Sequence, residues 1–377
     1  MDINERNCYL WMNHISTFRL GDPAKLFRKY GSSVRVYEAL TGSEEEREKL
    51  VKDKTIKKTT AEEIGEIDEK RWFERLNEDI ERGKITVYTP ADEEYPEKLC
   101  DIVNPPLAIF CKGRTELLYS EHMIAMIGTR RPTHYGAAVA DEFSKALAAR
   151  GFTIVSGMAM GIDARSHEGA LAVDGNTVAV LGGGVDICYP LSNFDIYEEL
   201  CERGLLVSEY EPGEAHVAIH FPVRNRIISG LSDSVLVVEA ALRSGTLITT
   251  DYALEQGKEI YAIPGRVSDM MSRGVNNLIK QGAMLVDSPG DIIMDSFGFS
   301  GGTAEASAEG TNSPASTYAL SKSQQRILGL LGYEPVYIDD IIRANNMDIS
   351  DTLHQLAALK DMGFVKVFEQ SYYVLNK

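Results

Sequence analysis

Basic residues are scarce in this chain of 377 residues. Lysine and arginine number 39 against 56 aspartates and glutamates, which gives a formal net charge of −17 at pH 7. An exterior this acidic argues against a protein that coats nucleic acid through a broad basic face. Any contact with nucleic acid must therefore be confined to a local groove.

Cysteine is also sparse, and long apolar runs are missing. The five cysteines are odd in number and form no Cys-x-x-Cys pair, so neither a disulfide framework nor a zinc site is indicated. The first residues lack the basic-then-apolar layout of a signal peptide, and no apolar run approaches the about 20 residues that span a bilayer. We expect a cytoplasmic protein with reduced thiols, no metal and no cofactor.

The chain does contain a repeated alternation of short apolar runs and helical segments. The first run, 123–127, stops at Gly128, and a second ends at Ser156. Further strands are expected at 177–181, 205–209, 234–239, 260–263 and 284–286, with helices at 163–173, 194–203 and 246–256. Such alternation predicts an α/β fold with a parallel sheet buried on both faces. These sheets bind ligands outside the carboxyl ends of their strands.

Other segments flank the predicted sheet. Residues 1–85 have the layout of a helix-hairpin-helix or sterile-alpha-motif-like module, and a helical cap packed on the next domain is the simpler interpretation. Two prolines open the segment 105–113, which favours one extra strand at the edge of the sheet. Residues 299–319 have the composition of a flexible tether.

The tail, residues 320–377, reads as three helices closed by a hairpin, which is the layout of a winged helix. A winged helix that reads DNA carries lysine and arginine along its third helix. Here the segment 350–360 offers only Lys360. Partner docking or packing is therefore the favoured role.

The loops at the expected carboxyl edge are rich in groups that bind anions. The turn at 128–131 offers backbone amides and two arginines, and 156–163 resembles a glycine-rich phosphate turn that opens a helix. A run of three glycines stands at 182–184, and 244–246 lies directly before a helix. With the arginines of 221–226, the edge has many anion donors and little that could perform chemistry.

Simpler interpretations of these loops stay open. The glycines could only punctuate strands, because neither a Gly-x-Gly-x-x-Gly spacing nor the Lys-Ser/Thr of a Walker loop is present. The arginines could be structural, with Arg130, Arg224 and Arg226 forming buried pairs with Glu209, Glu239 or Asp163.

Catalytic and metal-binding patterns are weak. His167 follows Asp163 by four residues, on one helix face, but no serine or cysteine nucleophile is tied to them. His216 and His220 are the one pair with ligand spacing, in a segment expected to be a loop. We expect neither a catalytic site nor a metal site.

The order and spacing of these motifs are similar to those of one family. The motifs include Tyr95-Pro96, Gly128-Thr129-Arg130, Ser156-Gly157-Met158-Ala159-Met160-Gly161-Ile162-Asp163, Gly182-Gly183-Gly184, Phe221-Pro222-Val223-Arg224-Asn225-Arg226, Ser244-Gly245-Thr246 and Ala262-Ile263-Pro264-Gly265. Over about residues 90–290 the chain resembles the DNA-processing family called DprA or Smf.

This resemblance implies an extended Rossmann-like sheet domain at 86–298, between the helical domain and the winged helix. It implies a bacterial cytosolic protein, not an enzyme, that binds and protects single-stranded DNA. Such a protein also loads the RecA recombinase during natural transformation or homologous recombination. A homodimer is implied through Val275, Asn277, Leu278 and Met284.

The resemblance also places the nucleic-acid site. Arg130 would contact the DNA backbone, and the lysine that follows Tyr-Pro in some members is Leu191 here. Bases could stack on Tyr189 and Phe221, which could equally belong to the core. The expected nucleic-acid-binding residues are Gly128, Thr129, Arg130, Ser156, Gly157, Gly161, Arg224, Asn225, Arg226, Ser244, Gly245 and Thr246.

Two other functions stay open beside that of a recombination mediator. One is an enzyme on small nucleotides, similar to nucleoside-monophosphate phosphoribohydrolases. The late position of Glu255 in its helix weakens this alternative. The other is an adaptor whose tail and amino-terminal module act through protein contacts.

Overall fold

The computed structural model describes residues 3–19, 23–296, 321–331, 336–345, 348–362, 364–368 and 371–375. These residues form two compact units. The first contains the amino-terminal helices and a large sheet, and the second contains the carboxyl-terminal helices and a small sheet. The tether predicted at 299–319 lies outside the described residues.

Short helices make up the amino-terminal part of the first unit, as expected. They are α1 (Glu5–His14), α2 (Ser16–Arg19), α3 (Ala24–Tyr30), α4 (Ser33–Thr41), α5 (Glu44–Lys52), α6 (Lys58–Glu66) and α7 (Glu69–Gly83). Their core includes the fully buried Trp11, Met12 and Leu40. The charged α5 begins with a capping box between Ser43 and Glu46, which satisfies amides at its start.

The large sheet has nine strands in the described residues. They are β1 (Thr86–Tyr88), β2 (Ile109–Gly113), β3 (Met123–Ile127), β4 (Thr153–Ser156), β5 (Thr177–Val180), β6 (Leu205–Ser208), β7 (Ser234–Val237), β8 (Glu259–Ala262) and β9 (Met284–Leu285). Their order is β1-β2-β6-β5-β4-β3-β7-β8-β9, and the strands from β6 to β9 are parallel. The extra strand β2 joins β6 antiparallel but is not outermost, because β1 pairs on its other side.

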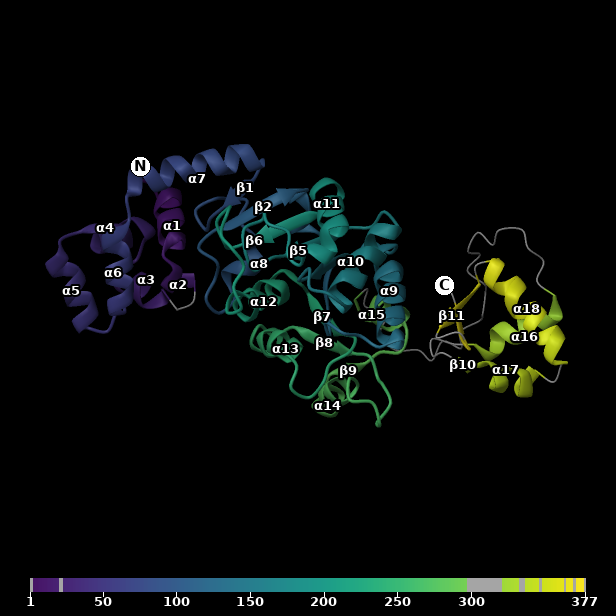
Figure 1. Ribbon diagram of the computed structural model, residues 1–377. Helices are drawn as coiled ribbons and strands as arrows, with labels where there is room; N and C mark the ends of the chain where they lie inside the picture. Colours follow the sequence, from purple (N-terminus) through teal and green to yellow (C-terminus); the bar gives the residue numbers. More distant parts are fainter. Residues whose placement is uncertain are drawn as a thin grey trace. The chain divides into compact units, whose positions relative to one another are not determined.

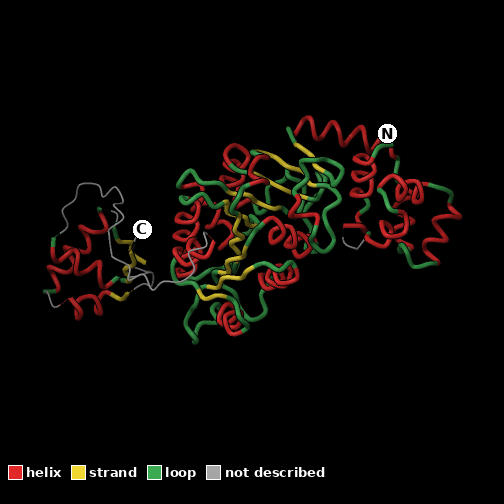
Figure 2. The backbone as a smooth tube through the Cα atoms, turned by 180° about the vertical axis from the view of Figure 1, so that it is seen from behind, coloured by secondary structure: helices red, strands yellow, loops and turns green. Residues whose placement is uncertain are grey.

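Helices cover both faces of this sheet. The helical elements are α8 (Glu97–Cys100), the 3-10 helix Thr115–Tyr119, α9 (His134–Ala148), α10 (Ile162–Ala172), the 3-10 helix Leu191–Asn193, α11 (Phe194–Arg203), α12 (His220–Leu231), α13 (Thr246–Glu255), α14 (Arg273–Lys280) and α15 (Pro289–Ser296). Figure 1 shows α10 and α11 on the face opposite to α12 and α13. Figure 2 shows the strands as a layer between these helices.

The alternation of side chains along the strands explains the two faces. In β5, Val178 and Val180 pack in the same core as Ile227 of α12, whereas Ala179 packs with Leu171 of α10. Both sides of each strand are therefore apolar, as expected for a doubly covered parallel sheet. The parallel α/β sheet predicted from the sequence is confirmed.

The second unit is a winged helix, as predicted. It contains α16 (Lys322–Leu330), β10 (Val336–Tyr337), α17 (Ile338–Asn345), α18 (Ile349–Asp361), β11 (Val365–Phe368) and β12 (Tyr372–Leu375), with strand order β10-β12-β11. Ile327, Ile341, Leu356 and Val365 form its core.

In the part of the chain that the structure describes, no helix combines the length and apolar character needed to cross a membrane.

Candidate nucleic-acid interface

A cleft opens where the strand order reverses. β4 borders β3 on one side and β7 borders it on the other, and the chain builds β4, β5 and β6 before it returns to β7. The loops after β3 and β7 therefore leave the sheet in opposite directions, which creates a crevice at the carboxyl ends of the strands. The cleft found there has a volume of about 640 Å³.

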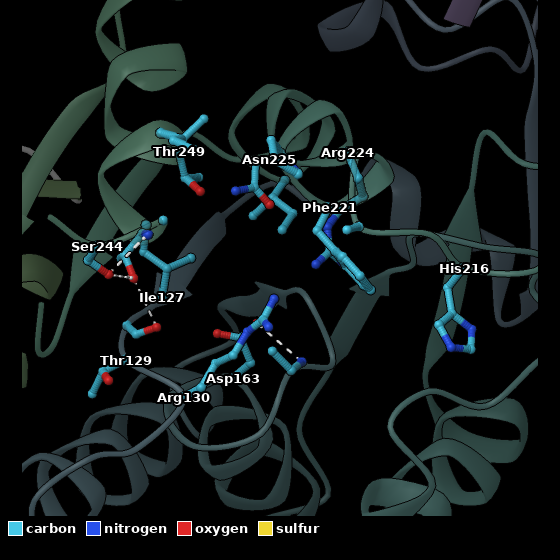
Figure 3. Close-up of a pocket in the computed structure, with 18 of the residues that line it drawn as sticks. Ile127, Thr129, Arg130, Asp163, His216, Phe221, Arg224, Asn225, Ser244 and Thr249 are labelled. Atoms are coloured by element: carbon cyan, nitrogen blue, oxygen red, sulfur yellow. Dashed lines mark hydrogen bonds between the residues drawn. The ribbon is translucent and has the colours of Figure 1, made fainter. Parts of the chain in front are cut away.

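Loops that follow five parallel strands line this cleft. The lining residues are 127–130 after β3, Ala159 and Asp163 after β4, Tyr189 after β5, His216, Ala218, Phe221, Pro222, Arg224, Asn225 and Ile228 after β6, and Ser244, Gly245, Thr246, Ile248 and Thr249 after β7. The turn 128–130, Arg224, Asn225 and the turn 244–246, which were predicted from separate parts of the sequence, thus meet in one cavity (Figure 3).

Arg130 is the cation that faces the open cleft. Its side chain is exposed and makes no hydrogen bond or ion pair with another described residue. Its guanidinium carbon lies 5.4 Å from the centroid of the Phe221 ring, and that of Arg224 lies 6.0 Å from the same centroid. Phe221 therefore presents one ring to two cations, an arrangement that holds guanidinium groups by cation–π attraction.

Arg224 supports the cleft from beneath. Its side chain is buried, and its Nη1 donates to the carbonyl of Gly157 at 2.8 Å and to the carbonyl of Val180. Burial lowers the pKa of Arg224 to about 10, partly offset by Asp163, so the group stays cationic at neutral pH. Because Nη1 is bonded to backbone carbonyls and the side chain is only 4 % exposed, we assign Arg224 a positive charge beneath the cleft in place of the direct DNA contact predicted.

The glycine-rich turn after β4 is closed by a carboxylate of the chain itself. Gly157 N and Ala159 N both donate to Asp163 Oδ2, at 3.2 and 3.3 Å. Burial raises the pKa of Asp163, and Arg224 opposes that shift. The amides predicted to hold a DNA phosphate are thus occupied, which corrects the expectation for Gly157.

Two neighbours of this turn shape the cleft without facing it. Ser156 is fully buried and donates to the carbonyl of Met126 at 2.6 Å. Gly161 has φ +84°, and a Cβ there would lie 2.4 Å from the carbonyl oxygen of Thr129. Glycine is needed at this position because the turn packs directly on the loop after β3. Direct DNA contacts by Ser156 and Gly161 are therefore not supported.

The start of α13 forms the opposite side of the cleft. Thr246 N donates to Ser244 Oγ at 3.2 Å, and Thr246 Oγ1 donates to the carbonyl of Gly128 at 3.0 Å. This second bond ties the helix start to the loop that carries Arg130. Gly245 is exposed, and the positive end of the helix dipole points toward the cleft.

Arg226 lies outside the cleft, which corrects a further part of the prediction. Its Nη1 and Nη2 bond both carboxylate oxygens of Glu209, at 2.8 and 2.6 Å, and its Nε donates to the carbonyl of Asn104. Both members of the pair are almost fully buried. The alternative of a buried structural pair, stated from the sequence, is confirmed for this arginine.

An aromatic wall, formed by His216, Tyr189 and Phe221, borders Arg130. The rings of Tyr189 and His216 are stacked 3.6 Å apart between centroids, and Tyr189 lies 5.7 Å from Phe221. Tyr189 is 43 % exposed, so its surface is open to a ligand. In the view of Figure 3, Phe221 lies between Arg130 and His216. Such faces stack on any base.

Sequence reasoning missed His216 as part of this wall, because the residue was paired with His220 as a metal candidate. His220 instead stacks on Tyr210 and bonds the carbonyl of Gly182 at 3.0 Å. Among the described residues no group of three or more histidine, cysteine, aspartate or glutamate side chains could hold a metal ion. Only the position of His216, in the loop after β6, could have suggested its role.

Two side chains considered for catalysis, His167 and Glu255, do not line the cleft. His167 is fully buried and bonds Thr177 Oγ1 at 2.7 Å, and burial lowers its pKa to about 3, so it stays neutral and away from the cleft. Glu255 is the last residue of α13 and does not line the cleft.

The predicted dimer residues divide into two groups. Val275 and Leu278 of α14 are buried in the core of their own sheet, which corrects their assignment to an interface. Asn277 is partly buried, and Met284, on the outermost strand β9, is 39 % exposed.

Comparison with known proteins identifies the family. The family model of DNA recombination-mediator protein A matches residues 86–296, and that of the DprA winged helix domain matches residues 311–363. The chain is 41% identical to the DNA processing protein DprA of Bacillus subtilis over 54% of this chain and 68% of that protein. It is 37% identical to Protein Smf of Escherichia coli over 81% of this chain and 80% of that protein.

Solved structures agree. DNA processing protein A of Streptococcus pneumoniae superposes with a TM-score of 0.65 at 33% identity, over 78% of this chain and 99% of that chain. DNA processing protein A of Helicobacter pylori, whose structure is described as giving insights into its unique single-stranded DNA binding mode, superposes with a TM-score of 0.52 at 30% identity, over 57% of this chain and 97% of that chain. This chain belongs to the DprA/Smf family of DNA processing proteins.

Proposed function

We propose that this protein binds single-stranded DNA in the cleft between the loops after β3 and β7. One observation carries the proposal. Arg130, an exposed cation without a bonded partner among the described residues, faces the same cavity as the aromatic wall and the start of α13. A single strand needs such neighbours, because its phosphates bind cations and helix-end amides while its bases stack on aromatic rings.

The open aromatic wall favours one strand over a duplex. Bases in a duplex are already stacked on each other, so an open aromatic wall serves only unpaired bases. The net charge of −17 leaves the cleft as a local positive site on an acidic protein. The single-stranded DNA binding of the Helicobacter pylori relative supports the same ligand.

We propose binding without catalysis. Asp163 and His167 are engaged inside the protein, and no nucleophile paired with a general base faces the cleft in the described part of the chain. Arg130 and the ring faces of the wall can hold a ligand through charge and stacking, which require no proton transfer.

Membership of the DprA/Smf family suggests what happens to the bound strand. We infer that the bound strand is protected and handed to the RecA recombinase in the cytoplasm, during natural transformation or homologous recombination. The family model's description as a recombination mediator supports this step. A homodimer would use the β9 side of the sheet, where Met284 and Leu285 are exposed on an edge strand.

The test compares two arginines that differ in place but not in charge. We expect Arg130→Ala to weaken binding of a short oligothymidine about tenfold and to reduce the magnitude of the slope of log K against log salt by about 0.7, because one phosphate contact is lost. Arg150 is exposed in the turn before β4, at the amino edge of the sheet. Arg150→Ala removes the same charge and should leave both quantities near those of the parent.

Fluorescence anisotropy of a labelled oligonucleotide, titrated at several salt concentrations, measures both quantities. Equal binding by the Arg130→Ala and Arg150→Ala variants would remove Arg130 from the site. A parent protein that shows no salt-dependent binding at all would overturn the proposed function.

A further inference from the structure

The loop between β6 and α12, residues 209–219, connects two regions of the first unit. Its first half touches the amino-terminal helices, and its second half carries His216 of the aromatic wall. The cleft and the amino-terminal domain thus share one stretch of backbone. This loop is the physical route by which one could act on the other.

Three side chains of the amino-terminal helices hold this loop by its glutamates. His14 Nδ1 lies 3.0 Å from Glu211 Oε2, and Trp72 Nε1 donates to the Oε1 of the same carboxylate at 3.2 Å. Arg19 donates to Glu214 Oε1 at 2.7 Å. Arg19 is only 6 % exposed, so water screens this ion pair little. We call these five residues the brace.

Backbone and ring contacts extend the brace on both sides. Asn13 Nδ2 donates to the carbonyl of Glu209 at 3.0 Å. The guanidinium of Arg19 lies over the ring of Tyr210 at 5.3 Å, and Tyr210 stacks on His220 at the start of α12. Phe221 follows directly. The amino-terminal helices therefore contact the chain on the approach to His216 and to Phe221, two of the three rings of the aromatic wall.

The position of His216 depends on this loop. Its Nδ1 is buried and has no hydrogen-bond partner among the described residues, so the ring is held by its backbone and by the stack with Tyr189. Two residues before it, Glu214 bonds Arg19 through its side chain and accepts a bond from Gly184 N at 2.9 Å through its carbonyl. Release of this side chain would leave Glu214 held only through its carbonyl, on the sheet side.

We propose that the brace, through which the amino-terminal helical domain holds this loop, positions the aromatic wall for the bases of single-stranded DNA. The inference rests on the proposed function and adds a role for a domain outside the cleft. His14, Arg19 and Trp72 touch no DNA and act through the loop. Their loss therefore weakens the contacts made to bases, while the phosphate contacts at Arg130 and α13 stay intact.

The test uses the full chain with Glu211→Ala and Glu214→Ala combined, which we call the brace variant. The matched control combines Glu168→Ala and Glu199→Ala, which remove two exposed glutamates from surface ion pairs. Both double variants lose two negative charges, so long-range electrostatics alone would tighten DNA binding in both. We expect the brace variant to bind oligothymidine about fivefold more weakly than the control, since part of the stacking is lost.

A strand of equal length built from abasic sites separates the two kinds of contact. Both double variants should bind it equally, because it offers phosphates without bases. In a Tyr189→Ala background the brace variant should lose nothing further, since residues that act together are not additive. Trp72→Phe, which removes the N–H donor and keeps a smaller aromatic ring, should show a smaller loss of the same kind without a change in fold.

Three outcomes are distinguishable. A parent protein that binds neither strand defeats the proposed function itself. A parent that binds, with brace and control variants equal on oligothymidine, overturns the brace alone. An equal loss on oligothymidine and on the abasic strand also overturns it, because the loop would then act on phosphates or on the fold.

Discussion

Glu209→Ala is expected to destabilise the sheet domain by about 3–5 kcal/mol, the usual cost of leaving one charge of a buried ion pair without its partner. Glu209 accepts two bonds from Arg226, at 2.8 and 2.6 Å, and the two side chains are 1 % and 3 % exposed. After the substitution the guanidinium keeps only bonds to backbone carbonyls. Equilibrium urea unfolding, followed by circular dichroism, measures the change.

The control removes both charges. Glu209→Leu combined with Arg226→Met should cost less than Glu209→Ala, because no unpaired charge remains in the core. A double variant as unstable as the single one would show that the bonds from Arg226 to the backbone matter more than the ion pair. A loss below about 1 kcal/mol in Glu209→Ala, typical of exposed pairs, would contradict the burial seen here.

Phe221→Ala is expected to weaken oligothymidine binding about tenfold to a hundredfold, the range for loss of a stacking ring. Within the aromatic wall Phe221 lies next to Tyr189, and both Arg130 and Arg224 lie over its ring. Its removal therefore also frees Arg130 from its cation–π contact. The salt slope should stay close to that of the parent, since no phosphate contact is deleted.

Two further substitutions at Phe221 distinguish the effect of an aromatic face from that of side-chain volume. Phe221→Tyr keeps an aromatic face and should bind within about threefold of the parent, whereas Phe221→Leu keeps apolar volume and should behave like Phe221→Ala. If leucine restores full binding, Phe221 fills space and does not stack on bases. Unfolding midpoints of the variants show whether any loss of binding comes from the fold.

The strands, and the edge of the sheet at which their loops meet, could be predicted because the sequence patterns that mark them are local. Apolar runs place the loops of β3, β4 and β7, the first two runs end directly before glycine, and a parallel sheet brings the carboxyl ends of its strands together. Which donors stay free could not be predicted. The amide of Gly157 is taken by Asp163, six residues away, and no spacing rule says whether a turn binds an external anion or its own carboxylate.

Partners distant in sequence explain the other errors. Arg226 and Glu209 are 17 residues apart, and only the packing of α12 on the sheet turns the arginine inward, away from the cleft. Val275 and Leu278 form one face of α14, and the pattern of a helix face does not tell whether its own sheet or a second molecule covers it. The role proposed for His216 depends on Tyr189, from the loop after another strand.

Photo-crosslinking tests the central claim most directly. An oligothymidine that carries 5-iodouracil is bound to the full-length protein, irradiated and digested, and the crosslinked peptides are identified by mass spectrometry. The account predicts crosslinks at Tyr189 and within residues 216–225, lost when unlabelled single-stranded DNA competes. Crosslinks confined to the winged helix, residues 321–375, or to the amino-terminal helices, residues 5–83, would contradict it.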